Sequence, residues 1–389
     1  MVEYPIYKLK EVSLIIAGQS PESKYYNSVG DGLPFFQGKA DFGDLYPTIR
    51  TYCSKPTKIA EKDDILLSVR APVGPTNLSP GKVCIGRGLS AIRPGEKLDL
   101  RYLLYYFRQY EAYLREKGTG TTFKAITQDI LKNLEIPVPP LEEQKRIVAR
   151  IEELFSELDA AVATLEQTKE QLAVYRQAVL KEAFESLSHD TPYPFIRDVC
   201  HEVKVGIVIK PKQYYTDKPN GIRAFRSANV REFYVNDSDW VYLTEYGHEQ
   251  NKRSEIHTGD VLVVRSGYPG TACVVPEEFN NCNAIDILIA VPNKDKITSE
   301  YLCAYTNSPH GRKLITEKKR GVAQAHLNVG GYSQMTIPVP DIETQKQIVD
   351  GIELKLSIYD NIMKTLDDSL REAEAMRQSI LKRAFAGEL

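Results

Sequence analysis

One block of sequence occurs twice in this chain, 201 residues apart. The first copy begins IPVPPLEEQKRIVARIEELF at Ile136, and the second begins IPVPDIETQKQIVDGIELKL at Ile337. Aligned without gaps, residues 136–184 and 337–385 share 21 identical positions out of 49. Self-similarity of this kind marks an internal duplication. The chain must therefore fold into an architecture that contains the same structural unit twice.

Each copy predicts a short extended segment followed by a long helix. The prolines of IPVP cannot lie inside a helix, and neither 141–188 nor 342–389 contains a proline. Apolar residues then recur at alternating spacings of four and three, the heptad pattern of a coiled coil, with a less regular start in the second copy near Lys355. The predicted helix-pairing seam consists of Ile147, Ile151, Leu154, Leu158, Leu165, Leu172, Ile348, Ile352, Tyr359, Ile362, Leu366 and Ile380. The simplest partner for one helix is the other copy, and pairing between two chains is the alternative.

The segments that precede the two copies share the same order of predicted elements but differ in their loop residues. Each contains a strand-like run that ends in arginine, DILLSVR at 64–70 and DVLVVR at 260–265, followed by a Pro/Gly-rich turn, APVGP or SGYPG. We expect an α+β protein in which two mixed α/β domains alternate with two long α-helices that pair as an antiparallel coiled coil, related by a pseudo-twofold repeat. The predicted boundaries are 1–139 and 189–340 for the domains, and 140–188 and 341–389 for the helices.

Composition and motifs argue against several classes of protein. No run approaches the roughly 18 apolar residues that span a bilayer, and the N-terminal residues lack a signal-peptide core. We therefore expect a cytoplasmic protein with no membrane partner. The six cysteines are scattered without a CxxC pair, which predicts buried thiols and no metal site.

The motifs of common enzyme classes are missing as well. The sequence contains no GxxxxGK[ST] loop, GxGxxG turn, HExxH or GxSxG. We predict a binding protein with no catalytic residues; an enzyme with an unrecognised site is the alternative.

The distribution of charge is compatible with a nucleic-acid partner. Residues 142–186 and 341–389 hold 20 acidic and 13 basic side chains, whereas residues 1–141 hold 15 acidic and 19 basic ones. Arg, Lys, Asn, Gln and His side chains read base edges or contact phosphates. The candidate DNA-binding residues in the variable loops are Gln37, Lys39, Arg70, Arg87, Lys124, Arg226, Asn229, Arg231, Arg265, Lys318, Lys319, Arg320, Gln324 and His326. Arg70 and Arg265 occupy equivalent strand ends, where pairing with a carboxylate of the scaffold is the other possible role.

The duplicated block resembles a known family. The helices introduced by IPVPPLEEQKRIV and IPVPDIETQKQIV, with their ends RQAVLKEAF and RQSILKRAFAGEL, are similar to those of the specificity subunits of type I restriction-modification systems. The resemblance implies two target recognition domains, each reading one half of a split site on double-stranded DNA. It also implies that the helices set the gap and dock two modification (methyltransferase) subunits, which restriction (translocase and nuclease) subunits join.

The same resemblance implies a non-catalytic subunit. S-adenosylmethionine, ATP and Mg are then expected in the partner subunits and no cofactor in this chain. Because target recognition domains diverge, the resemblance assigns no base-reading residue here. Two other functions remain open: the recognition subunit of a system in which modification and cleavage are fused in one partner, and a coiled-coil scaffold without a DNA role.

Overall fold

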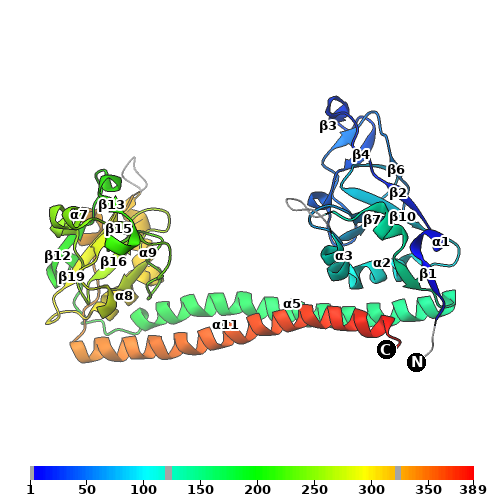
Figure 1. The fold of residues 1–389 in the computed structure, drawn as a ribbon. Helices are drawn as coiled ribbons and strands as arrows, with labels where there is room; N and C mark the ends of the chain where they lie inside the picture. Colours follow the sequence, from blue (N-terminus) through cyan, green and yellow to red (C-terminus); the bar gives the residue numbers. More distant parts are fainter. Residues whose placement is uncertain (1–3, 119–124, 320–325) are drawn as a thin grey trace. The chain divides into compact units, whose positions relative to one another are not determined.

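The computed structural model describes residues 4–118, 125–319 and 326–389 of the chain. Its contacts divide the chain into two compact units, residues 1–165 with 368–389 and residues 166–367. Each unit contains one globular part and one stretch of each of the two long helices (Figure 1). The predicted α+β class and the alternation of domains with helices are confirmed.

The globular part of the first unit contains two sheets that pack against each other. The four-stranded antiparallel sheet has the order β2 (Ser13–Ala17), β10 (Leu89–Pro94), β7 (Ile65–Ser68) and β8 (Thr76–Leu78). The five-stranded sheet has the order β3 (Tyr26–Asn27), β5 (Tyr52–Cys53), β4 (Leu33–Phe36), β9 (Val83–Ile85) and β6 (Ile59–Ala60). Strands β4 and β9 are parallel, and β1 (Ile6–Lys8) pairs separately with β11 (Glu135–Pro137).

Short helices cover the other face of the four-stranded sheet. They are α1 (Leu9–Val12), α2 (Leu100–Gln109), α3 (Glu111–Lys117) and α4 (Gln128–Lys132). The same globular part contains the 3-10 turns η1 (Ser23–Tyr25) and η2 (Lys39–Asp41). Ile65 and Leu67 face α2, whereas Leu66 faces the second sheet. Successive side chains of a strand point to opposite faces. A strand covered on both faces is apolar throughout, which explains the run DILLSVR.

The second unit repeats this plan. Its antiparallel sheet has the order β12 (Cys200–Val205), β19 (Ile287–Pro292), β16 (Val261–Val264) and β17 (Ala272–Val274). Its second sheet has the order β13 (Tyr215–Thr216), β15 (Val241–Leu243), β14 (Ile222–Phe225) and β18 (Asn283–Ala284). The helices are α6 (Ile196–Val199), α7 (Glu245–Gln250), α8 (Ser299–Asn307), α9 (Pro309–Lys319) and α10 (Val329–Ser333), with 3-10 turns η3 (Pro211–Tyr214), η4 (Lys218–Asn220), η5 (Lys252–Ser254) and η6 (Glu277–Phe279).

The duplicated IPVP joint is held in the same way in both units. Tyr102 of α2 is buried, and its hydroxyl donates a hydrogen bond of 2.9 Å to the carbonyl of Pro137. Tyr301 of α8 makes the same 2.9 Å bond to Pro338. Proline leaves a carbonyl but no N–H, so a buried tyrosine hydroxyl supplies the donor that this extended segment needs. The aromatic helix and the joint therefore recur together.

A buried glutamine fastens the start of each long helix. The Oε1 atom of Gln144 accepts from the backbone N–H of Asp99, and its Nε2 atom donates to the carbonyls of Lys97 and Pro139, each at 2.8 Å. Gln345 makes the equivalent three bonds, to Thr298, Lys296 and Pro340. Both glutamines are fully buried. We call the three hydrogen bonds of each glutamine the glutamine latch. This latch explains why Gln recurs at this position of the repeat.

Replacing Gln144 with leucine removes a polar side chain that satisfies three backbone groups. Each buried backbone group left without a partner costs about 1–3 kcal/mol. We expect Gln144→Leu to lower the free energy of unfolding of the first unit by about 3–5 kcal/mol. The thermal midpoint in differential scanning calorimetry should fall by about 10 °C.

Gln378 provides the matched control, since it is exposed on α11 in the same unit. Gln378→Leu should change the free energy of unfolding by no more than about 0.5 kcal/mol. Equal midpoints for the two variants would show that the latch does not stabilise the unit.

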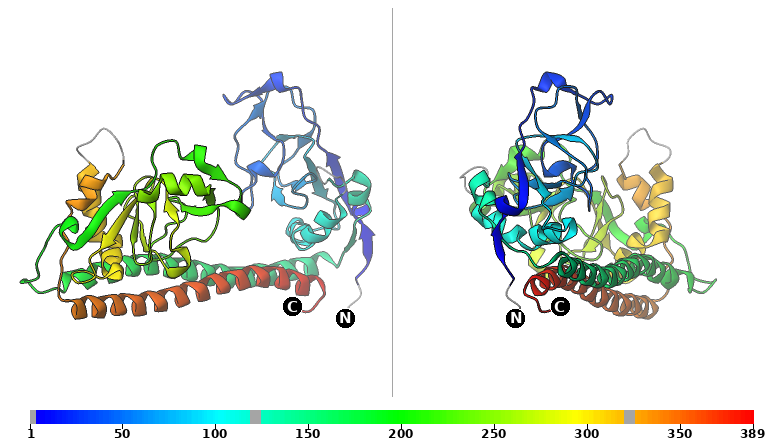
Figure 2. Two further views of the ribbon diagram at one scale, coloured as in Figure 1. Left: turned by 60° about the vertical axis from the view of Figure 1, so that its left-hand side comes forward. Right: turned by 90° about the vertical axis from the view of Figure 1, so that its right-hand side faces the viewer.

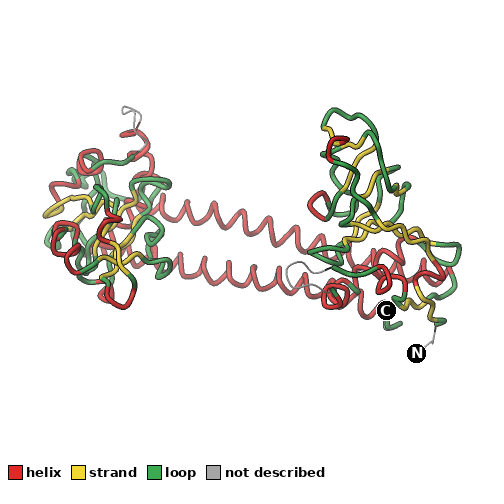
Figure 3. Tube along the Cα trace, turned by 45° about the horizontal axis from the view of Figure 1, so that its top comes forward, coloured by secondary structure: helices red, strands yellow, loops and turns green. Residues whose placement is uncertain are grey.

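The two long helices are α5 (Leu141–Glu185) and α11 (Ile342–Phe385). Figure 3 draws each as an uninterrupted helix, and Figures 1 and 2 show the two lying side by side within each unit. In the first unit, Leu158 packs on Ala373 and Ile380. In the second, Lys169 pairs with Asp367 at 2.6 Å and Glu182 with Lys355 at 3.4 Å. Residue numbers fall along α11 as they rise along α5, so the predicted antiparallel pairing within the chain is confirmed.

The burial pattern defines a regular seam on both helices. Buried or half-buried residues recur at positions 144, 148, 151, 155, 158, 162, 165, 169, 172, 176, 179 and 183 of α5, and at the positions 201 residues later in α11. Of the predicted seam residues, Ile151, Leu158, Ile352, Leu366 and Ile380 are buried, and Ile147, Leu154, Leu165, Leu172, Ile348 and Tyr359 are half-buried. Ile362 differs because it is 40% exposed, and its neighbour Met363 takes the seam position. Ile147, Leu154 and Ile348 are half-buried but also lie one residue before the regular seam positions 148, 155 and 349.

The remaining general features are the cysteines and the character of the helices. All six cysteines are free and buried. Burial raises the pKa of Cys200 and Cys273 to about 12 and that of Cys282 to about 11. In the described ranges, no helix is both long and apolar enough to cross a bilayer.

Candidate nucleic-acid interface

Four of the predicted residues in the first unit gather around one turn, Gly86–Gly88, that follows β9. The carbonyl of Gly88 accepts from the N–H of Val69, which precedes Arg70. The N–H of Gly86 donates to the carbonyl of Phe36, and a Cβ at Gly88 would lie 2.3 Å from the carbonyl oxygen of Gln37. Because the backbones meet this closely, side chains from separate parts of the sequence share one edge. The four residues of this edge are Gln37, Lys39, Arg70 and Arg87.

This edge carries three positively charged side chains without ion-pair partners among the described residues. Gln37, Lys39, Arg70 and Arg87 are all exposed. None of the three cations forms an ion pair with any residue in the described part of the chain. Exposed cations without carboxylate partners are suited to contacts with phosphate groups. Lys124 lies outside the described residues, while Ala125, which follows it, forms a bridge with Arg70.

Two predicted arginines of the second unit form hydrogen bonds within the protein. Arg226 donates to the carbonyl of Asp239 at 2.5 Å and to its carboxylate at 2.9 Å. Arg231 donates to the carbonyls of Ser227 and Val230, at 3.3 and 3.0 Å. Their planar guanidinium groups are thereby fixed in orientation, and both side chains remain half-buried rather than enclosed.

Asn229 holds the loop that carries these arginines. Its Oδ1 atom accepts from the N–H of Arg226 at 3.0 Å, and its Nδ2 atom donates to the carbonyl of Ser238 at 2.8 Å. The side chain is fully buried. A base edge cannot reach an amide in this position, so Asn229 supports the loop, and the prediction that it contacts DNA directly does not fit its placement.

The two strand-end arginines differ although their positions are equivalent. Arg70 is exposed, whereas the side chain of Arg265 is only 17% exposed. Arg265 pairs with Asp286 at 2.5 Å and donates to the carbonyl of Leu327 at 3.0 Å. In the second unit this position therefore has the scaffold role that the sequence left open.

The last group of predicted residues lies between the end of α9 and His326. His326 is exposed, and its Nδ1 atom lies 2.6 Å from the hydroxyl of Ser266. Lys318 and Lys319 belong to the end of α9, but their side chains are not among those described. Arg320 and Gln324 lie outside the described residues.

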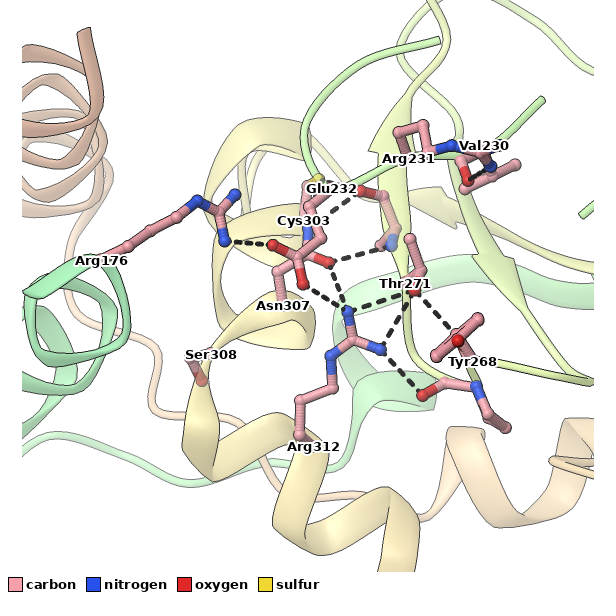
Figure 4. A network of polar contacts seen from close by, with 12 residues as sticks. Arg176, Val230, Arg231, Glu232, Tyr268, Thr271, Cys303, Asn307, Ser308 and Arg312 are labelled. Atoms are coloured by element: carbon pink, nitrogen blue, oxygen red, sulfur yellow. Dashed lines mark hydrogen bonds and ion pairs between the residues drawn. The ribbon is translucent and has the colours of Figure 1, made fainter. Parts of the chain in front are cut away.

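A polar network that the sequence did not reveal joins the second globular part to α5 (Figure 4). The carboxylate of Glu232 pairs with Arg176 of α5 through one oxygen and with Arg312 of α9, at 3.0 Å, through the other. Burial lowers the pKa of Arg312, and the charge of Glu232 acts in the opposite direction. A half-buried carboxylate between two arginines is compensated in this way. Sequence reasoning missed Glu232 and Arg312 because 80 residues separate them.

A hollow of about 710 Å³ lies beside this network. Its lining includes Ser227, Arg231, Ser266, Tyr268 and Thr271, so hydrogen-bonding groups and an aromatic ring face it from two loops. Tyr268 is 85% exposed. The Pro/Gly-rich composition of SGYPG predicted this turn, and the tyrosine inside it was the signal that an exposed aromatic side chain sits there.

Comparison with a protein family model covers both halves of the chain. The model for the type I restriction modification DNA specificity domain matches residues 1–172 and residues 196–372. Each match spans one globular part and continues into the long helix that follows it.

Several curated proteins are similar to this chain. A protein of Methanocaldococcus jannaschii named for the type I restriction enzyme MjaX specificity subunit is 44% identical over 167 residues, which is 43% of this chain and 38% of that protein. The type I restriction enzyme EcoBI specificity subunit of Escherichia coli is 26% identical over 76% of this chain and 66% of its own length. The EcoKI specificity subunit of Escherichia coli K12 is 24% identical over 90% of this chain and 80% of its own length. The chain thus spans less than two thirds of the first two relatives.

Two solved structures are also similar. The HsdS subunit from Thermoanaerobacter tengcongensis is 51% identical over 41% of this chain and 39% of that one, with a TM-score of 0.38. The type I restriction-modification system S subunit from M. genitalium is 16% identical over 98% of this chain and 96% of that one, with a TM-score of 0.39.

Proposed function

We propose, from the fact that this chain belongs to the type I restriction modification DNA specificity family, that it is the specificity subunit of a type I restriction-modification complex. Each globular part is then a target recognition domain that reads one half of a bipartite site on double-stranded DNA. The observation that carries this proposal is the duplication, in which the same joint, sheet order and helix seam recur while the exposed residues differ. A repeated scaffold with two different surfaces suits two different half-sites.

The two surfaces support contact with DNA by different means. In the first domain, exposed Lys39, Arg70 and Arg87 are free to contact phosphates. In the second, Arg226 and Arg231 are fixed by hydrogen bonds, which orients a guanidinium group for a directed contact. The proposed DNA-binding residues remain those of the variable loops, with Asn229 and Arg265 as their supports. Lys124, Lys318, Lys319, Arg320, Gln324 and His326 stay candidates.

The proposed partners follow from the same function. We assign two modification subunits to the paired helices α5 and α11, and restriction subunits to the complex that these form. Methylation, ATP-dependent translocation and cleavage then reside in the partners, which bind S-adenosylmethionine, ATP and Mg, whereas this chain is not catalytic. The site of action is the cytoplasm, where the DNA target lies.

A methylation map tests the proposal. This chain is co-expressed with its cognate modification subunit in a host that lacks adenine methylation, and the genome is sequenced by a method that detects methyladenine. We expect a motif of two short specified blocks around an unspecified gap. The modification subunit expressed alone is the control and should leave the genome unmethylated. A stable complex that methylates no split motif would favour the coiled-coil scaffold.

A further inference from the structure

The turn between β16 and β17 presents an aromatic side chain on a rigid support. Tyr268 is 85% exposed and stands between two glycines in the left-handed region, Gly267 at φ +79° and Gly270 at φ +88°. Few side chains adopt these φ values without strain. The turn therefore has a defined shape, and its tyrosine side chain is largely exposed.

Arg312 fixes this turn from below. One guanidinium nitrogen donates to the carbonyl of Pro269 at 2.9 Å and to the hydroxyl of Thr271 at 3.2 Å. The same hydroxyl donates to the carbonyl of Tyr268 at 2.9 Å. Two consecutive hydrogen bonds, through Thr271, thus connect a partly buried cation to Tyr268, and the bond to Pro269 holds the next residue of the turn. These bonds hold the turn in one conformation, with the Tyr268 side chain exposed.

Glu232 extends this support to the spacer helix. By the 201-residue repeat, Arg176 corresponds to Arg377, which pairs with Asp159 across the helix seam of the first unit. The residue equivalent to Asp159 is Asp360, and it lines a second hollow, of about 490 Å³, together with Arg176. Arg176 nevertheless pairs with Glu232 of the globular part. In the second unit, the arginine at this position therefore links the helix to the globular part, whereas in the first unit it links the two helices.

The neighbouring loop is tied to the same frame. The N–H of Phe233 donates to the carbonyl of Ala272 at 2.9 Å, and Phe233 adopts φ +72°, a strained value for an aromatic residue. The guanidinium of Arg176 lies 6.0 Å from its ring centre. Loop 226–234 and turn 266–271 consequently form one surface, and both line the hollow of about 710 Å³.

We propose that Tyr268 is a specificity-determining contact with the second half-site, and that Glu232 is the positioning residue that holds its turn to helix α5. This inference rests on the proposed function. An exposed tyrosine on a fixed turn is suited to stack on, or wedge beside, a base step. Hydrogen-bonding groups around the hollow, among them Arg231 and Ser266, then meet base edges or the backbone beside it.

The test uses the complete complex with the modification subunit and three duplexes. One carries the full target found by the methylation map, one an altered first half and one an altered second half. Dissociation constants from fluorescence anisotropy give the discrimination ratio at each half. Tyr268→Ala should weaken binding of the full target about tenfold and reduce discrimination at the second half by a similar factor. Discrimination at the first half should stay within about twofold.

Two variants control for the loss of an exposed side chain. Tyr268→Phe keeps the stacking ring and should bind the full target within about threefold of the wild type. Tyr246→Ala removes another tyrosine of the same domain, 67% exposed on α7, and should change neither ratio. Wild-type affinity and wild-type discrimination in Tyr268→Ala would overturn the assignment of this contact.

Glu232→Gln tests positioning while preserving the shape of the side chain. The two arginines lose their shared negative charge, so discrimination at the second half should fall about fivefold, with the first half unaffected. Asp159→Asn removes the equivalent ion pair of the first unit and should leave both ratios unchanged. Equal losses at both halves in Glu232→Gln would assign it a general structural role instead.

The outcomes separate this inference from the function on which it rests. A wild-type complex that discriminates at neither half contradicts the proposed function, and this inference falls with it. A wild-type complex that discriminates at both halves, with variants that behave like the wild type, contradicts only the roles of Tyr268 and Glu232.

Discussion

Exchanging residues 189–336 for the corresponding segment of a relative with a different target is expected to change one half of the methylated motif. The other half and the gap should stay the same. The exchanged segment contains the second globular part, while both long helices and both IPVP joints are retained. If each domain reads its own half-site, the new segment brings a new half-site with it.

The contacts at the joint decide which donor segments will fold. Phe184 of α5 packs against Tyr301 and Tyr305 of α8, with ring centres 5.4 and 5.2 Å apart. Gln345 accepts from the N–H of Thr298. A donor should therefore keep aromatic residues at the two tyrosine positions and a short polar N-cap before α8. It should also supply an acidic residue for Arg176, which otherwise loses Glu232.

The measurement is a methylation map of the chimera, with the parent chain and the donor chain as references. A motif that combines one half from each reference would establish independent reading. A chimera that folds and assembles but alters both halves would contradict the assignment of one half-site to each domain.

Lengthening both long helices by four residues is expected to lengthen the recognised gap by one or two base pairs. We place the insertions after Gln167 and after Asp368, which are equivalent by the 201-residue repeat. Lys169 pairs with Asp367, so the two insertion points lie opposite one another on paired helices. Native contacts on either side are then preserved, and the inserted turns face each other. Four residues of helix add about 6 Å, and a base pair of B-DNA rises about 3.4 Å.

Rotation decides whether the longer gap can be used. Four residues turn a helix by about 400°, a net right-handed rotation of about 40°. One or two base pairs turn DNA by about 35–70° in the same sense. Seven residues turn a helix by about 700°, a net rotation of about 20° in the opposite sense, while about three base pairs turn DNA by roughly 100°. The rotation that four residues add to the helix is therefore close to the rotation that the extra base pairs add to the DNA. The rotation that seven residues add is not.

Methylation of the genome and of short duplexes with graded gaps measures both variants. The four-residue variant should methylate a motif with a longer gap, and the seven-residue variant should lose most of its methylation at every gap. An unchanged gap in the four-residue variant would rule out the helices as the spacer.

The helices were predictable because their signal is repeated and local. Prolines set their starts, and the heptad pattern gave their length and showed that each helix needs a partner. The duplication made the other copy the simplest partner, and pairing between two chains stayed open. The seam was less certain where two apolar residues are adjacent, as at Ile362 and Met363. Ile is the more hydrophobic choice, but the repeat from Val162 places Met363 in the seam. The apparent irregularity near Lys355 disappears when the seam runs through Val349, which is buried, in place of Ile348 and then through Leu356, which is half-buried.

The candidate interface was less predictable because its contacts are long-range. Residue type alone does not distinguish Arg70, which is exposed, from Arg265, which pairs with Asp286 across 21 residues. Asn229 has the composition of a base reader, yet its loop folds back and buries it. Residue type can select polar groups, but only the folded loops determine which of them face outward.

The buried cysteines give each unit a chemical reporter of its own motion. Cys53 and Cys84 belong to the first unit, whereas Cys200, Cys273, Cys282 and Cys303 belong to the second. Thiol reagents attack the thiolate, and burial both raises the pKa of Cys84 and Cys303 and blocks access to them. Labelling must therefore wait for local opening, so its rate measures how often each domain opens. Followed by mass spectrometry with and without DNA, these rates separate tightening of one domain from tightening of the other.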